Sequence, residues 1–235
     1  MRIGLTCALA AIGCGPTARI PHAPVGLPRA VLADSAGRNL AMVLAPVLYI
    51  QPDEEFRLER VVAVIHPDRA VIAYHLLWRD DAHGAWIPFT SPTDQEIVWV
   101  GHDSAGRPTE MWTYWHGSIL HTDWRGKGEP AVDVQWGKHG SLPHNVVLGD
   151  LPWIRQLDVY YLLSWVLLPD LWLGNLSRDG PWCFCASFAR YNSFTRVVPV
   201  AMRLDAIVET AAPESILRRV FGEGFSGKPA WPWRH

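Results

Sequence analysis

The sequence predicts a mainly β protein, an antiparallel β-sandwich with a few helices appended in its C-terminal third. Two patterns support this fold class. From about Val43 to Trp136, short runs of β-branched and aromatic residues alternate with turn signatures. After Gly149 the chain changes to longer apolar stretches with helix boundaries. The composition, 49% hydrophobic and 19% charged, is typical of a folded globular protein and excludes a disordered one.

Two hairpins are expected in the first half. Leu58 to Ile65 and Ala70 to Trp78 are β-branched runs on either side of a His-Pro-Asp-Arg turn. Glu96 to Val100 and Thr109 to Trp115 flank a second turn, which contains glycine and proline. Each pair of runs is therefore expected to form adjacent antiparallel strands.

Two further strands are expected around these hairpins. Val43 to Ile50 is an apolar run interrupted by a proline, which favours a position at a sheet edge. Ala131 to Trp136 alternates, so that Val132, Val134 and Trp136 share one face.

The last third is expected to be mixed. Leu151 to Leu168 is predicted as a buried helix that ends before Pro169, and 213–221 as a short amphipathic helix. Trp182 to Phe188 and Thr195 to Val200 are candidate strands between them. Because no repeat and no clear linker appears, residues 30–235 are predicted to form a single domain.

The N-terminus resembles a bacterial lipoprotein signal. Arg2 precedes an apolar run from Ile3 to Gly13, which ends at Cys14 after small residues. Residues 1–14 are therefore predicted to be a signal with Cys14 as the lipidated residue, and the Pro-rich residues 15–29 to be a tether. The mature protein would be held at the membrane of the bacterial cell envelope by acyl chains, or lie in the periplasm. The alternative is that residues 1–14 form a buried first strand or helix.

Charge and aromatic content limit the partners. The net charge is −2 and there is no basic run, so nucleic acid is not an expected partner. The 13 tryptophans have two possible roles. They can pack in the core with their N–H groups paired, or exposed ones can form a platform for sugars.

One constellation of residues has the right chemistry for a site. Asp94 and Glu96 are two residues apart at a strand start, so both carboxylates project from one face. His116 ends the partner strand, His121 is expected in the loop that follows, and His139 lies directly after another strand. If these strands are neighbours, the five side chains meet at one end of a sheet. They would then suit a divalent cation such as Ca²⁺, Mg²⁺ or Zn²⁺, or an acid–base pair.

Three functions remain compatible with these residues. The first is a non-catalytic binding or envelope protein with a site for a cation or small ligand. The second is a metal-dependent hydrolase in which a carboxylate acts as the base. The third is a carbohydrate-binding protein that uses exposed tryptophans. Neither a nucleophile elbow nor a phosphate-binding loop is present, and whether the protein is an enzyme stays open.

The region from residue 73 to residue 143 resembles a known pair of families. Tyr74 to Trp78, then 94–100, then the Lys-His-Gly-Ser-Leu-Pro run at 138–143 follow the order of motifs in the necrosis-inducing (NPP1-like) and Vps62-related proteins. The resemblance covers about a third of the chain. It implies a β-sandwich with a divalent cation held by acids and histidines at one edge.

The resemblance transfers only three residues of that cation site, namely Asp94, Glu96 and His139. Gln95 replaces the tryptophan that those families place between the acids. The preceding stretch, 90–93, reads Thr-Ser-Pro-Thr where the families have Gly-His-Arg-His. The first two metal-site residues of the necrosis-inducing family are thus missing, and toxin activity is not implied.

Overall fold

The computed structural model describes residues 26–54, 56–79, 94–145 and 197–233. The predicted signal with Cys14, most of the predicted tether, the helix expected at 151–168 and the strand expected at 182–188 lie outside these residues. Among the described residues, no helix is long and apolar enough to cross a membrane.

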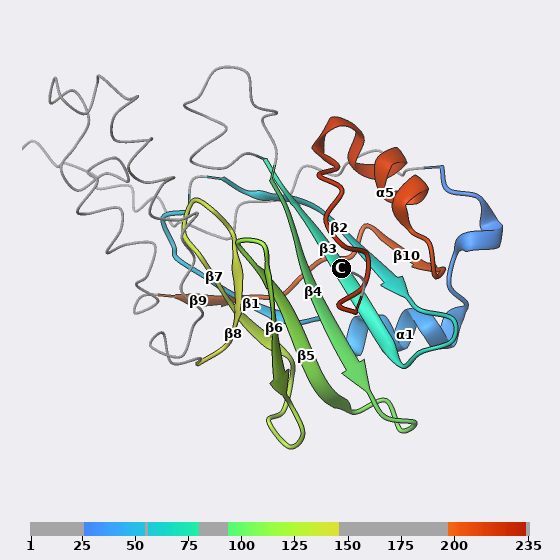
Figure 1. The fold of residues 1–235 in the computed structure, drawn as a ribbon, viewed down its shortest axis with the longest axis horizontal. Coiled ribbons are helices and arrows are strands. Elements are labelled where there is room, and N and C mark those ends of the chain that lie inside the picture. Colours follow the sequence, from blue (N-terminus) through green and yellow to red (C-terminus); the bar gives the residue numbers. More distant parts are fainter. Residues whose placement is uncertain (1–25, 55, 80–93, 146–196, 234–235) are drawn as a thin grey trace, which may run out of the picture.

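Two β-sheets pack face to face (Figure 1). The six-stranded sheet has the order β10 (Ala206–Glu209), β2 (Leu58–Ile65), β3 (Val71–Trp78), β4 (Asp94–His102), β5 (Pro108–Trp115) and β6 (Ser118–Asp123). The four-stranded sheet has the order β8 (Ser141–Pro143), β7 (Ala131–Val134), β1 (Val47–Ile50) and β9 (Val198–Val200). The remaining described elements are two α-helices, α1 (Ser35–Val43) and α5 (Glu214–Phe221), and two short 3₁₀ helices, η1 (Arg29–Val31) and η3 (Gly222–Gly224). The predicted β-sandwich is confirmed.

The pairing is mainly antiparallel, with two exceptions that the sequence did not predict. β2 through β6 are joined by consecutive antiparallel pairs, which include both predicted hairpins. β10 pairs with β2 in parallel, and β1 pairs with β7 in parallel. Both sheets are therefore mixed.

The central strands of the six-stranded sheet, β2, β3 and β4, are buried on both faces. Its inner face, with Ile72, Tyr74 and Val98 among others, packs against the four-stranded sheet and α1. Its outer face is covered by α5 and by the C-terminal segment, which crosses β3 and β4 (Figure 1). Because side chains alternate across a strand, the near-continuous apolar runs of β2 and β3 supply both cores.

Two predictions about local structure are wrong. β1 is not an edge strand, because it lies between β7 and β9; Pro46 precedes the strand, so no ladder hydrogen bond is lost to it. His121 lies within β6 and not in a loop, since the chain turns back directly after Trp115. The helix α1 was not predicted at all; Asp34 caps it by accepting a hydrogen bond from Gly37 N at 2.7 Å.

Candidate functional site

Three of the five predicted site residues meet at one end of the sandwich. Asp94 and Glu96 start β4, in phase with the inward-facing Val98. His139 comes from the connection between β7 and β8, where it adopts a left-handed backbone conformation with φ 55°. Glu54 and Lys228, which the sequence did not single out, join them. Together these five side chains form the buried charge cluster, namely Glu54, Asp94, Glu96, His139 and Lys228.

Short polar contacts connect all five side chains. His139 Nδ1 lies 3.1 Å from Asp94 Oδ2, and His139 Nε2 lies 3.5 Å from Glu54 Oε1. Lys228 Nζ donates to Glu96 Oε1 at 2.7 Å and lies 3.8 Å from Asp94 Oδ1. Glu54 is fixed in turn by the backbone N–H groups of Gly137 and Phe56, at 2.8 and 3.0 Å. The charges are thus arranged in alternation.

Aromatic rings enclose the buried charge cluster. The ring of Trp78 stacks on His139 with the centroids 4.2 Å apart and the planes 5° from parallel. Lys228 Nζ lies 4.9 Å from the ring centroid of Tyr114. At Gly140 a Cβ atom would lie 2.9 Å from Cε3 of Trp115, so only glycine allows the backbone to approach this closely. Water is largely kept away from the charges.

The protonation of the buried charge cluster follows from these contacts. Burial lowers the pKa of His139, but hydrogen bonds to Asp94 and Glu54 outweigh it and raise that pKa to about 9. Burial raises the pKa of Asp94, but Lys228 and His139 outweigh it and lower that pKa to about 2. For Glu96, burial dominates and raises the pKa to about 7. At neutral pH two cations therefore face two full anions and one partly ionised carboxyl group.

His116 and His121 do not join the buried charge cluster. The Nε2–H of His116 donates to Gln135 Oε1 at 2.7 Å, and burial lowers the pKa of this imidazole to about 4. His116 is thus a neutral neighbour of the cluster. His121 Nε2 lies 2.9 Å from Glu110 Oε2, where the exposed His121 side chain on β6 faces β5, away from the other four residues.

The geometry does not fit a divalent cation between the two carboxylates. Asp94 Oδ1 and Glu96 Oε1, which would face such an ion, face the ammonium of Lys228. In the described part of the chain, no three His, Cys, Asp or Glu side chains gather in an arrangement that would hold a metal. The Ca²⁺, Mg²⁺ or Zn²⁺ ion expected from the sequence stays a prediction.

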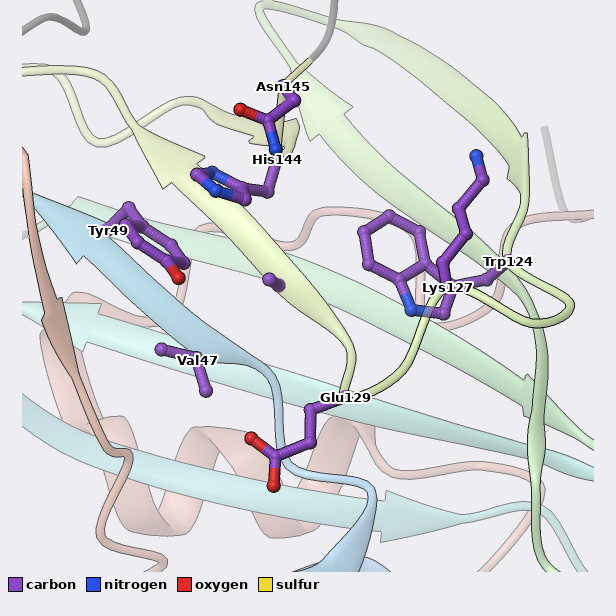
Figure 2. A pocket seen from close by; sticks show the side chains of 8 residues that line it. Val47, Tyr49, Trp124, Lys127, Glu129, His144 and Asn145 are labelled. Carbon is purple, nitrogen blue, oxygen red and sulfur yellow. The ribbon is translucent and has the colours of Figure 1, made fainter.

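A second region has an open cavity of about 590 Å³. It lies over β1, β7 and the connection between β6 and β7 (Figure 2). The residues that line this β1–β7 cavity are Val47, Tyr49, Trp124, Lys127, Glu129, Ala131, His144 and Asn145. Figure 2 shows Tyr49 and His144 on one side of it and Trp124 and Lys127 on the other.

One buried carboxylate orders the polar side of the β1–β7 cavity. Asp133 Oδ1 accepts a hydrogen bond from His144 Nδ1 at 2.8 Å, and Asp133 Oδ2 accepts one from Asn145 N at 3.0 Å. The imidazole of His144 stacks on the ring of Tyr49, with a centroid distance of 3.7 Å and an angle of 8°. Asn145 follows in a left-handed backbone conformation with φ 64°. Because the ring of His144 is held by both the hydrogen bond to Asp133 and the stacking on Tyr49, this wall is ordered by contacts within the chain.

The sequence offered little signal for the added residues. Glu54 lies in a polar turn that reads as ordinary solvated surface, and Lys228 follows a glycine in the C-terminal tail. Tyr49 and His144 are 95 positions apart. Tyr49 lies on β1 and His144 directly follows β8, and both strands pair with β7, which brings the two residues together.

No protein-family model and no curated protein matches this chain. Among solved structures, it is similar to NLPPya in complex with glucosamine, at 14% identity and a TM-score of 0.38, over 55% of this chain and 74% of that one. NLPPya in complex with mannosamine matches at 13% identity and a TM-score of 0.36, over 52% and 74%. A structure described as a toxin fold as basis for microbial attack and plant defense matches at 13% identity and a TM-score of 0.34, over 47% of this chain and 69% of that one. The resemblance to the necrosis-inducing family is confirmed as a likeness of fold, and no site residue is transferred by it.

Proposed function

We propose that this chain is an exported, non-catalytic binding protein whose β1–β7 cavity holds a small hydroxylated ring compound of the carbohydrate class. The observation that carries the proposal is the ordered pair of stacked rings, Tyr49 and His144, in the wall of an open cavity. Its volume lies within the usual range of ligand pockets.

The lining has the chemistry that a sugar ring requires. The apolar C–H face of such a ring packs on aromatic and aliphatic surface, which Tyr49, Trp124 and Val47 provide. Its hydroxyl groups need donors and acceptors at the edge, which Lys127 and Glu129 provide. Apolar rings combined with a few polar groups are typical of a site that fixes both the position and the orientation of a ligand.

The carboxylates support binding rather than hydrolysis. Glycoside hydrolysis ordinarily uses two carboxyl groups that flank the scissile bond. Among the described residues that line the cavity, Glu129 is the one carboxylate, and both oxygens of the neighbouring Asp133 are engaged by His144 and Asn145. Within the described part of the lining, the second carboxylate that this chemistry needs is therefore missing.

Export belongs to the same proposal. The lipoprotein-type sequence ending at Cys14 and the Pro-rich residues that follow would hold the sandwich at the surface of a membrane of the cell envelope. Cys14→Ser is expected to move the protein from the membrane fraction to the soluble fraction. Unchanged fractionation would contradict the anchor.

Binding is tested by calorimetric titration with glucosamine, mannosamine and short oligosaccharides. Tyr49→Ala is expected to weaken binding at least about tenfold, because it removes one ring of the stacked pair. His121→Ala is the matched control, since this exposed imidazole lies outside the cavity. If none of the sugars binds, or if both variants bind equally well, the proposal is wrong.

A further inference from the structure

We propose that the ammonium of Lys228 is the resident cation of the buried charge cluster, so that the C-terminal segment takes the place that the sequence suggested for a divalent metal ion. The proposal is independent of ligand binding in the β1–β7 cavity. It rests on where Lys228 Nζ lies, how its chain segment is held, and how the strands leave room for it.

The position of Lys228 Nζ is that of a counter-ion. It donates to Glu96 Oε1 at 2.7 Å and lies 3.8 Å from Asp94 Oδ1 and 4.9 Å from the ring centroid of Tyr114. Two carboxylates that begin the same strand would repel each other in this enclosed place. An ammonium between them supplies the opposing charge without a bound ion.

The segment that carries Lys228 is fixed on both sides. Before it, Ser226 N donates to the side-chain oxygen of Gln95 at 2.9 Å. After it, Ala230 O accepts from Trp99 Nε1 at 2.9 Å, and the fully buried Trp231 donates from its indole to Ala211 O at 2.8 Å. The lysine is thus placed by its backbone neighbours and not by its own flexible side chain.

The strands provide an opening for the side chain. β4 starts at Asp94, but its pairing with β5 starts only at Val98, opposite Thr113. Among the described strands, residues 94–97 pair with β3 alone. The segment from 226 to 231 packs on the outer face, as does Ile97, whereas Glu96 belongs to the alternate set of side chains. Lys228 therefore reaches Glu96 where β4 and β5 are not joined.

Three measurements on the full chain test the proposal. Elemental analysis of protein purified without chelators is expected to find far less than one equivalent of divalent metal. EDTA, Ca²⁺, Mg²⁺ and Zn²⁺ are each expected to leave the melting temperature unchanged. Lys228→Met is expected to lower the melting temperature by roughly 10 °C, because it leaves buried carboxylates without their counter-ion. Lys127→Met, at an exposed lysine outside the cluster, is the matched control and is expected to change it little.

Amine labelling of the wild-type protein tests the same point without a variant that has to fold. Lys228 is expected to react with an acylating reagent at least about tenfold more slowly than Lys127, and equally fast after unfolding. Addition of Ca²⁺, Mg²⁺ or Zn²⁺ is expected to leave this ratio unchanged. A stoichiometric metal, a loss of stability in EDTA, an unchanged melting temperature in Lys228→Met, or faster labelling of Lys228 with added cation would each overturn the proposal.

Discussion

The buried charge cluster and the β1–β7 cavity are both built around an acid–histidine pair, yet they differ in what their polar groups face. In the cluster, the His139–Asp94 pair is enclosed by Trp78 and neutralised by Lys228 from the same chain. In the cavity, the His144–Asp133 pair supports a wall that borders open space. A high density of ionisable residues therefore does not by itself mark a binding site. Such residues are available to a ligand only where the chain does not already supply their partners.

The largest expected effect is that of Asp94→Asn on the cluster. This change leaves Lys228 and protonated His139 facing less negative charge, and breaking a buried ion pair costs about 3–5 kcal/mol of the free energy of unfolding. Chemical denaturation measures it. Asp123→Asn, which removes an exposed ion pair with Arg125, is the control and is expected to change the free energy of unfolding little. Similar losses in both variants would remove the distinction between buried and exposed pairs.

The second effect is a loss of stability at alkaline pH. The pKa of His139 is raised to about 9 in the folded protein, because its hydrogen bonds to Asp94 and Glu54 outweigh burial. The stabilisation is therefore complete below pH 6.5 and is lost as the pH rises through about 9, which amounts to about 3 kcal/mol. Glu96, with a pKa raised to about 7, acts in the same direction at lower pH, between about 4.5 and 7.

At acid pH other groups lower the stability, namely Asp94, whose pKa is lowered to about 2, and two histidines outside the cluster. Burial lowers the pKa of His75 to about 3 and that of His116 to about 4. Their contribution is complete above pH 6.5 and is lost as the pH falls toward these values. Denaturant unfolding across pH 3–10 is the measurement. His139→Gln is expected to flatten the alkaline limb, and an alkaline limb that persists in this variant would contradict the assignment.

A smaller effect is expected from Asp133→Asn beside the cavity. The amide keeps the size of the side chain but cannot accept from both His144 Nδ1 and Asn145 N, so the wall is expected to loosen. The expected cost is about 1–2 kcal/mol in the free energy of unfolding, with a loss of roughly tenfold in ligand affinity. Calorimetry and denaturation together measure both. Lost stability with unchanged affinity would show that the wall does not contact the ligand.

The smallest effect is expected from His121→Ala. This imidazole pairs with Glu110 on the exposed surface, and such pairs contribute little. The free energy of unfolding is expected to change by less than about 0.5 kcal/mol, and ligand affinity is expected to stay the same. A large loss in either quantity would restore His121 as a site residue.

Much of the sandwich was predictable because its signals are local. The runs at 58–65 and 70–78, with a turn between them, identify β2 and β3 almost residue for residue. Pro213 and Gly222 bracket α5 as expected. The parallel pairs β1–β7 and β2–β10 were not predictable, because nothing local reports which distant strand a segment will join.

The candidate site was predictable only in part, for the same reason. The alternation of β4 places Asp94 and Glu96 on one face, and the position of His139 after β7 brings it to the same end. Lys228 lies 132 positions from Glu96, and the sequence gives no sign that its tail folds back across β4. Without the position of Lys228, the carboxylates of Asp94 and Glu96 suggest a metal site. With Lys228 in place, they form an internal ion cluster.

The most direct test of the difference between the β1–β7 cavity and the buried charge cluster is a ¹H–¹⁵N spectrum of the tryptophan indole groups during a titration with amino sugars and oligosaccharides. Trp124 lines the cavity, whereas Trp78 stacks on His139 in the buried charge cluster. We predict that the Trp124 signal shifts with saturable dependence on the ligand while the Trp78 signal stays in place. A shift of Trp78 with Trp124 unmoved would contradict the assignment of the two regions.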